Sequence, residues 1–165
     1  MQNKVILIAL TILMSAFNAN AVEVGQAAPQ FTLPSLQQNQ PTGLNQFSGK
    51  VVYVDFWASW CLPCRTSFPL LNALHQKLRD RNFEVVAINL DEDKANAEKF
   101  LKDIPVTFTV LHDPNGEWAD KFVVESMPTS FIIDKQGVIR NIHHGFVSDD
   151  IKGLEQKIVQ LLAAK

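Results

Sequence analysis

Two runs of consecutive apolar residues dominate the first half of the chain, and a segment with helical spacing lies between them. Residues 51–57 are apolar, β-branched or aromatic apart from Asp55, and the run has the length of a strand. In residues 67–81 the apolar side chains recur every three or four positions, which predicts a helix. Residues 83–90 form the second apolar run, typical of a parallel strand buried on both faces. The pattern therefore predicts a strand–helix–strand unit.

The alternation of strand and helix patterns continues to the end of the chain. The predicted order is helix, strand, short helix, two strands and a final helix, at residues 96–104, 108–111, 117–122, 129–134, 138–143 and from Ser148 onward. The two adjacent strands flank a Lys-Gln-Gly turn and predict a hairpin, and Ser148 is expected to cap the final helix. Alternating units give a parallel sheet with helices on both faces, and the hairpin adds antiparallel strands.

The N-terminal residues have the features of an export signal. Lys4 precedes a short apolar run at residues 5–13, and Ala19-Asn20-Ala21 has the pattern of a cleavage site. The run is shorter than the roughly 20 residues of a membrane-spanning helix, so a retained membrane anchor is the less favoured alternative. We expect residues 1–21 to be a signal peptide cleaved after Ala21, and residues 22–165 to be one domain in the periplasm.

Charge and cysteine content narrow the possible functions. The net charge of −2 and the lack of a basic cluster argue against nucleic acid as a partner. Cys61 and Cys64 are the two cysteines of the chain. A disulfide across two intervening residues restricts the unfolded chain very little, and tetrahedral zinc needs about four ligands. The pair is therefore interpreted as a redox centre beside a βαβ pattern, with no metal site and no cofactor expected.

Four segments resemble exported thioredoxin-like proteins of the TlpA/ResA type. They are Ala-Pro-Gln-Phe-Thr-Leu at 28–33, Phe-Ser-Gly-Lys at 47–50, Asp-Phe-Trp-Ala-Ser-Trp-Cys-Leu-Pro-Cys at 55–64 and Met-Pro-Thr-Ser-Phe-Ile-Ile-Asp at 127–134. The resemblance implies an α/β thioredoxin fold, with a central mixed sheet flanked by helices and an N-terminal strand extension. It also implies a cis bond before Pro128 and dithiol–disulfide exchange with protein substrates. Where thioredoxins carry a lysine near a buried acid, this chain is expected to have Ala87.

Three residues are expected to carry the chemistry. Cys61 lies at a helix N-terminus, where free N–H groups and the helix dipole stabilise a thiolate, so it is the predicted nucleophile. Cys64, one turn further on and more buried, is the predicted resolving thiol. Asp55 lies in an apolar strand, where burial should raise its pKa. By resemblance it exchanges a proton with Cys64, although a buried aspartate without a catalytic role remains an alternative.

The resemblance also suggests substrate-binding and modulating residues. Trp60 and Pro63 adjoin the cysteines, with Trp60 at an exposed rim. A cis Pro128 would set up Met127 and Thr129 to pair with the backbone of a substrate.

Two further residues are candidate modulators of the redox pair. Glu92 matches a glutamate near the disulfide of ResA-type reductants, but with Asp91 and Asp93 it also fits a solvated acidic loop. The hairpin should bring His144 near the disulfide, where its protonated form would lower the pKa of Cys61. A solvated strand end is the alternative for His144.

The favoured function is an exported thiol–disulfide oxidoreductase that reduces protein disulfides. Its expected partners are disulfide-containing proteins and a membrane or periplasmic thiol that supplies electrons. An oxidant or isomerase uses the same chemistry in another direction. A copper chaperone using both thiols and a histidine is a less favoured alternative, since thiolates suit Cu(I). Peroxiredoxins share the Ala-Pro-x-Phe segment at 28–31, but their cysteine motif differs from that of residues 60–64.

Overall fold

The apolar run at residues 51–57 forms the central strand of a mixed sheet. All seven residues of β3 (Val51–Trp57) are buried, because strands pair with both of its edges and side chains cover both of its faces. It pairs in parallel with β4 (Phe83–Asn89) and antiparallel with β6 (Thr129–Ile133). Strands β5 (Thr109–His112) and β7 (Ile139–His144) complete the order β5-β4-β3-β6-β7. The predicted parallel unit and the predicted antiparallel hairpin are both confirmed.

This computed structural model describes residues 22–38 and 40–164. The predicted signal peptide and its cleavage site lie outside the described residues. Within the described ranges, no helix is both long enough and apolar enough to cross a membrane.

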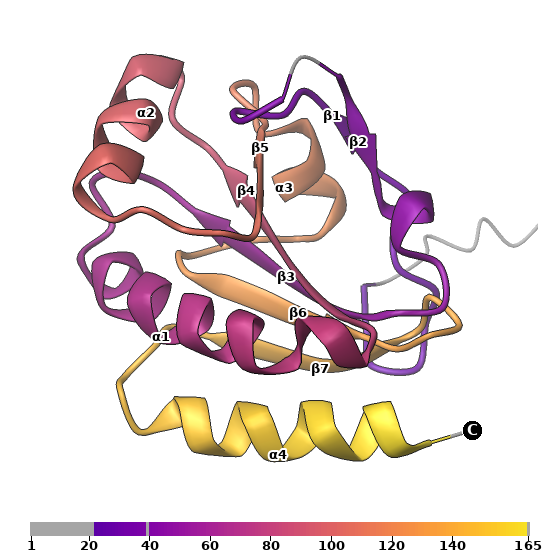
Figure 1. Cartoon of the computed structure of the whole chain (residues 1–165). Helices are drawn as coiled ribbons and strands as arrows, with labels where there is room; N and C mark the ends of the chain where they lie inside the picture. The colour runs from indigo at the N-terminus through magenta and orange to yellow at the C-terminus, as the bar shows by residue number, and fades with distance from the viewer. Residues whose placement is uncertain (1–21, 39, 165) are drawn as a thin grey trace, which may run out of the picture.

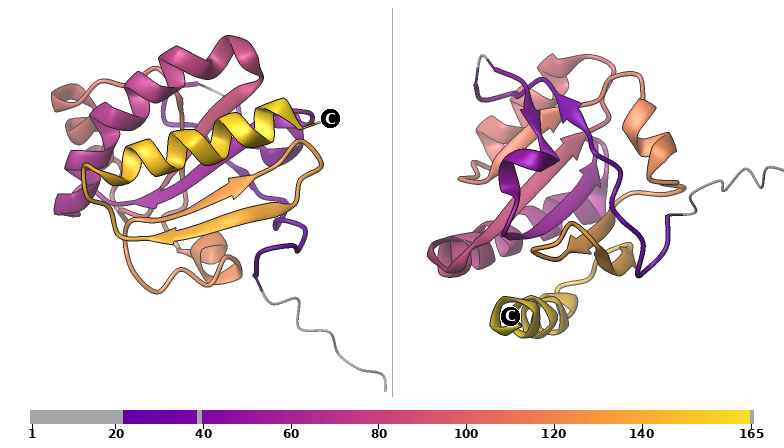
Figure 2. Two further views of the ribbon diagram at one scale, coloured as in Figure 1. Left: turned by 90° about the horizontal axis from the view of Figure 1, so that it is seen from below. Right: turned by 90° about the vertical axis from the view of Figure 1, so that its right-hand side faces the viewer.

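Helices cover both faces of the sheet (Figure 1, Figure 2). The residues of α1, α2 and α4 pack into one core layer on one face, while α3 and the N-terminal segment cover the other. The bounds of these helices are α1 Leu62–Leu78, α2 Lys94–Asp103, α3 Glu117–Lys121 and α4 Asp150–Ala163. The N-terminal segment contains β1 (Thr32–Leu33), β2 (Thr42–Gly43) and the 3-10 helix η1 (Leu44–Phe47), and a second 3-10 turn, η2 (Arg79–Arg81), follows α1. The expected N-terminal strand extension is thus present as a two-stranded antiparallel sheet.

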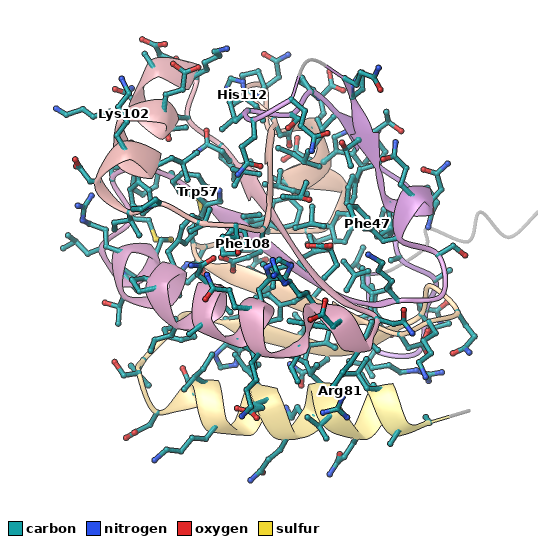
Figure 3. All side chains as sticks on the ribbon, viewed as in Figure 1. Phe47, Trp57, Arg81, Lys102, Phe108 and His112 are labelled. Atoms are coloured by element: carbon teal, nitrogen blue, oxygen red, sulfur yellow. A yellow bond between two sulfur atoms is a disulfide. The ribbon has the colours of Figure 1, made fainter. Side chains whose placement is uncertain are left out.

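Aromatic side chains fill the core layer beneath α1. Trp57 of β3 packs against Phe68 of α1 and Phe100 of α2, with ring centroids 4.6 and 4.7 Å apart. Figure 3 shows Trp57 and Phe108 in the interior between α1 and the sheet, and both are at most 1% exposed. Because α1 is held by these large rings, its first turn has a fixed position at the carboxyl end of β3.

The start of the final helix differs from the prediction. Its N-cap residue is Asp149 rather than Ser148, and the Asp149 side chain makes no capping hydrogen bond. The Asp150 carboxylate instead accepts a 2.7 Å hydrogen bond from the backbone N–H of Val147. An acid in the first turn also faces the positive end of the helix dipole, so Asp150 takes over the role expected of Ser148.

Candidate redox site

The two cysteines form a disulfide at the N-terminus of α1. Cys61 is the N-cap residue in an extended conformation, and Pro63 occupies the first turn, where its missing N–H costs no helical hydrogen bond. The Cα atoms of Cys61 and Cys64 are 5.3 Å apart, and the Cys64 backbone N–H donates to Cys61 Sγ at 3.2 Å. This N–H is placed to stabilise negative charge on Cys61 after reduction.

Cys64 is more buried than Cys61, as the sequence predicted. Cys61 retains 4% of its surface, whereas Cys64 retains none. A disulfide of another protein therefore has access to Cys61 alone. The roles of Cys61 as nucleophile and Cys64 as resolving thiol remain predictions, and this difference in exposure supports them.

Asp55 is buried in the middle of β3 without a charged partner. It is 1% exposed, and its Oδ2 atom has no hydrogen-bond partner among the described residues. Burial raises the pKa of Asp55 to about 8. The residue opposite it on β4 is Ala87, as expected, so the neighbouring strand supplies no lysine there. Asp55 shares its sheet face with Tyr53 and with the core cluster that contains both cysteines.

A cis peptide bond joins Met127 to Pro128, as the resemblance implied. Met127 packs against the core cluster that contains the cysteines. The Pro128 carbonyl accepts a 2.7 Å hydrogen bond from Gly145, and the Thr129 hydroxyl donates to the Ser126 carbonyl at 2.7 Å. The first bond ties the loop before β6 to the residue after β7, and the second holds the loop itself. Substrate binding by Met127, Pro128 and Thr129 stays a prediction.

Large apolar side chains are exposed next to the disulfide. Trp60 and Leu62, which flank Cys61 in sequence, are 69% and 76% exposed. A third exposed apolar side chain, Val147, lies two residues after Gly145 and is 63% exposed, but it is not placed at the disulfide. Pro63 is half-buried. An apolar rim of this kind is typical of a protein-binding surface.

The two candidate modulators lie in different surroundings. Glu92 is exposed in the loop after β4. His144, at the end of β7, lies opposite Thr129, with its Nδ1 atom 3.1 Å from Thr129 Oγ1. Its side chain borders a hollow with Phe131 and Ile142, which belong to the core layer on the face opposite the cysteines. Modulation of Cys61 by His144 or Glu92 therefore remains a prediction.

Asp91, which the sequence placed in a solvated acidic loop, is instead buried and anchors the segment before the cysteines. It is 3% exposed, and its carboxylate accepts hydrogen bonds from the backbone and the hydroxyl of Ser59, at 3.0 and 2.9 Å. Asn89 donates a third at 2.8 Å. The Asp91 carbonyl lies 2.8 Å from His112 Nε2, and a carbonyl only accepts, so that nitrogen carries the proton.

The sequence contained one sign of this anchor. Asp91 directly follows the buried strand pattern that ends at Leu90, and polar residues at the carboxyl ends of parallel strands gather at one edge of the sheet. That rule applies to Asp91 but not to its exposed neighbour Glu92.

The mixed sheet, the cis-proline loop and the Cys-x-x-Cys pair at a helix N-terminus together define a thioredoxin-like thiol–disulfide oxidoreductase. The chain belongs to the AhpC/TSA family, whose model matches residues 24–142. The thiol-disulfide oxidoreductase ResA of Geobacillus thermodenitrificans is 35% identical over 133 residues, which cover 80% of this chain and 76% of ResA. The thioredoxin-like protein YneN of Bacillus subtilis is 36% identical, with 83% and 79% covered.

Solved structures give the same assignment. A structure from Chlorobium tepidum, described as a DsbE-type thiol:disulfide interchange protein, has a TM-score of 0.82 and 44% sequence identity. The match covers 86% of this chain and 99% of that one. A structure from Bacteroides thetaiotaomicron, described as a protein disulfide isomerase, has a TM-score of 0.79 at 27% identity, with 86% and 91% covered. The predicted thioredoxin fold and thiol–disulfide chemistry are confirmed.

Proposed function

We propose that this protein is an exported reductant of protein disulfides. The Cys61 thiolate attacks a substrate disulfide and forms a mixed disulfide, and one substrate sulfur leaves as a thiolate. Cys64 then attacks Cys61 and releases the second substrate sulfur. The product on the enzyme is the Cys61–Cys64 disulfide present in the structure. Export places this cycle in an oxidising compartment, so a thiol donor has to regenerate the dithiol after each turnover.

The observation that carries the proposal is the position and pKa of Asp55. Resolution requires deprotonation of Cys64, a thiol with no exposed surface. Asp55 lies on the same sheet face, and burial raises its pKa to about 8, close to the pKa of a thiol. A carboxyl group with such a pKa can take the proton of Cys64 near neutral pH, since proton transfer is most efficient between groups of similar pKa. Rapid resolution releases the substrate in reduced form.

The surface around Cys61 fits an extended, partly apolar segment of a substrate protein. Trp60 and Leu62 offer exposed apolar contacts on one side of the sulfur. In the proposed complex, Pro128 faces the other side of the sulfur. It has no N–H, and the backbone on either side of it supplies donors and acceptors. An extended peptide that carries a cysteine can pair with this backbone as an added strand.

The reduction potential of the Cys61–Cys64 couple tests the direction of electron flow. The oxidised domain, residues 22–165, is equilibrated with dithiothreitol or glutathione buffers, and the dithiol fraction is counted by alkylation and mass spectrometry. A potential near about −270 mV, as in thioredoxin, supports a reductant. A potential near about −120 mV, as in the oxidant DsbA, would overturn the proposal.

Trapping tests the roles of the two cysteines. With Cys64→Ser, a disulfide-containing protein should remain covalently attached to Cys61, because nothing resolves the mixed disulfide. With Cys61→Ser, no such adduct should form, since Cys64 is fully buried. Adducts on Cys64 instead of Cys61 would reverse the assignment.

The N-terminus of the protein recovered from a periplasmic extract tests export. Mass spectrometry should find a mature chain that begins at Val22, as the Ala-x-Ala pattern predicts. An intact N-terminus on protein in the membrane fraction would instead support the anchored form.

A further inference from the structure

A row of polar residues crosses three neighbouring strands on the sheet face that holds Asp55. Ser130 of β6 lies directly opposite Asp55 of β3, and His143 of β7 lies directly opposite Ser130. Directly opposed side chains on antiparallel strands point to the same face, with Cβ atoms about 5 Å apart. The row therefore leads from the buried acid to the edge strand of the sheet.

The inner part of the row is a pair of buried hydroxyl groups. Tyr53 donates a 2.8 Å hydrogen bond from its hydroxyl to Ser130 Oγ, and the two residues are 1% and 2% exposed. Burial, together with the negative charge of Asp55, raises the pKa of Tyr53 well above its ordinary value, so Tyr53 remains a donor. Because Tyr53 donates to Ser130, the single proton of Ser130 is available to another acceptor.

The outer part of the row reaches solvent at the start of α4. His143 Nε2 lies 3.2 Å from Asp150 Oδ2, and each side chain is 27% exposed. The backbone N–H of Val147, with a further contribution from His143, holds the pKa of Asp150 below its ordinary value. Asp150 is thus a carboxylate at neutral pH. It lies within hydrogen-bond distance of His143 Nε2 and orients the imidazole.

We propose that Ser130 and His143 form the route by which Asp55 exchanges its proton with solvent. The proposal rests on the proposed function, in which Asp55 takes the proton of Cys64. In that step the S–H bond of Cys64 breaks, the Cys64 sulfur bonds to Cys61, and the bond from Cys61 to the substrate breaks. The electron pair of that bond leaves on the substrate sulfur.

Asp55 has to be ionised before it can take the proton of Cys64, and burial raises its pKa to about 8, so it is largely protonated near neutral pH. It therefore loses its own proton to solvent before the mixed disulfide is resolved. Asp55 passes it to the Ser130 hydroxyl, Ser130 passes its own proton to His143, and the imidazole releases one to water. Serine and histidine both accept one proton while they give up another, which is the property such a route requires.

Among the described residues, the neighbouring elements bring sulfur and apolar groups to the cluster around Asp55. Cys61 and Cys64, at the start of α1, and the apolar Ala87 of β4 belong to the core cluster on this face. The next polar pair between β7 and α4 joins Asn141 Oδ1 to Lys157 Nζ, and Asn141 lies opposite the apolar Ile132. It therefore connects the same two elements as the His143–Asp150 pair without touching the row.

Chemical rescue tests the route. The mixed disulfide with a short disulfide peptide is formed rapidly, and its decay to the Cys61–Cys64 disulfide is followed by quenched-flow and mass spectrometry. His143→Ala should slow this decay by about tenfold, part of the 10²- to 10⁴-fold that a positioned proton-transfer group contributes. Added imidazole should restore the rate, and formation of the mixed disulfide should not change. Asn141→Ala, the matched control, should resolve at the parent rate.

Ser130 variants test the buried half of the route. Ser130→Ala should be slow in the same decay and should not respond to imidazole, whereas Ser130→Thr keeps the hydroxyl and should retain most of the rate. Urea unfolding of each variant checks that it is folded. A parent-like rate in Ser130→Ala overturns the route.

Asp55→Asn separates the route from the proposed function. If Asp55→Asn resolves as fast as the parent, the role of Asp55 in the proposed function fails, and the route fails with it. Two other outcomes overturn the route while the proposed function stands. In both, Asp55→Asn resolves slowly. In the first, His143→Ala resolves as fast as the parent, and in the second, His143→Ala is slow but imidazole does not restore its rate.

Discussion

Two acids in the central strands of the sheet are both largely buried, but their pKa values move in opposite directions. Asp55, toward the carboxyl end of β3, has no charged partner among the described residues, and burial raises its pKa to about 8. Glu84, near the start of β4, lies 2.9 Å from His75 and 3.6 Å from Lys50. Burial alone would raise the pKa of Glu84, but the contact with His75 and the charges of His75 and Lys50 outweigh it and lower that pKa.

The comparison shows that the partners of a buried acid, rather than its burial, decide what it contributes. At the amino end of the parallel strands, Glu84 lies between His75 and Lys50 and joins α1 to the sheet through His75. Near the carboxyl end, Asp55 keeps an unpartnered oxygen on the face that holds the disulfide. Perturbed groups without partners gather at functional sites because chemistry needs a group that can change its charge.

The largest expected effect is a gain in stability from Asp55→Asn at alkaline pH. The folded-state pKa of about 8 lies above the value of 3.8 for an exposed aspartate. Stability contributed by Asp55 is therefore fully present below about pH 3.8 and is lost as the pH rises through 8. The isosteric amide does not titrate, so the variant should gain at most about 5 kcal/mol over the parent between pH 4 and pH 9.

Urea unfolding of the disulfide-bonded protein at several pH values measures this difference. The gain should rise steadily between about pH 4 and pH 8 and level off above the pKa of Asp55. A difference that stays constant between pH 4 and pH 9 would show that Asp55 titrates as an exposed acid does, and the contrast with Glu84 would disappear.

Glu84→Gln should have the opposite effect, a loss of about 3 kcal/mol at pH 6, because it leaves the buried His75 without its anion. The folded-state pKa of Glu84 is lowered, so its contribution is present above the ordinary value of 4.5 and is lost as the pH falls through the lower folded value. The difference between parent and variant should therefore shrink toward pH 3. Thermal or urea unfolding of parent and variant measures the loss of stability at pH 6 and at pH 3. An equal loss at both pH values would contradict the ion-pair account.

Ser59→Ala tests a third way of satisfying a buried acid, by hydrogen bonds alone. The variant removes one of the three donors to the Asp91 carboxylate and should lose about 2 kcal/mol, typical of a hydrogen bond to a charged group. Because Ser59 lies two residues before Cys61, alkylation of the reduced protein should also show a changed Cys61 pKa. Thr42→Val, a buried hydroxyl in the N-terminal sheet, is the control that should leave the pKa of Cys61 unchanged.

The sequence predicted the elements that depend on local pattern. The central strand, the hairpin and the burial of Asp55 follow from apolar periodicity and from turn residues, which act over a few positions. The cis bond before Pro128 came from resemblance, since local pattern does not distinguish cis from trans proline.

The remaining features of the site depend on which residues the fold brings together. Asp91 was expected in solvent because its neighbours are charged, but Ser59 and Asn89 enclose its carboxylate. Likewise, the period-two alternation of β7 puts His143 and His144 on opposite faces, and only the strand register shows that His143 shares the face of Asp55. A single sequence shows at most that such residues share one edge of the sheet, not which of them are in contact.

The smallest expected effect is that of Arg140→Gln, which removes the cation from a fourth acid, Asp134. Burial would raise the pKa of Asp134, but N–H groups of Val138 and Gln136 and the Arg140 guanidinium lower it. The two backbone donors, each 2.9 Å from Oδ1, stay in place when Arg140 is replaced. Arg140 is also 45% exposed, so water screens its charge, and the variant should lose only about 0.5 kcal/mol in urea unfolding. A loss as large as that of Glu84→Gln would mean that the cation, rather than the backbone, satisfies Asp134. Asp134 would then belong with Glu84, whose partners are side chains, rather than with Asp91, which is satisfied by hydrogen bonds.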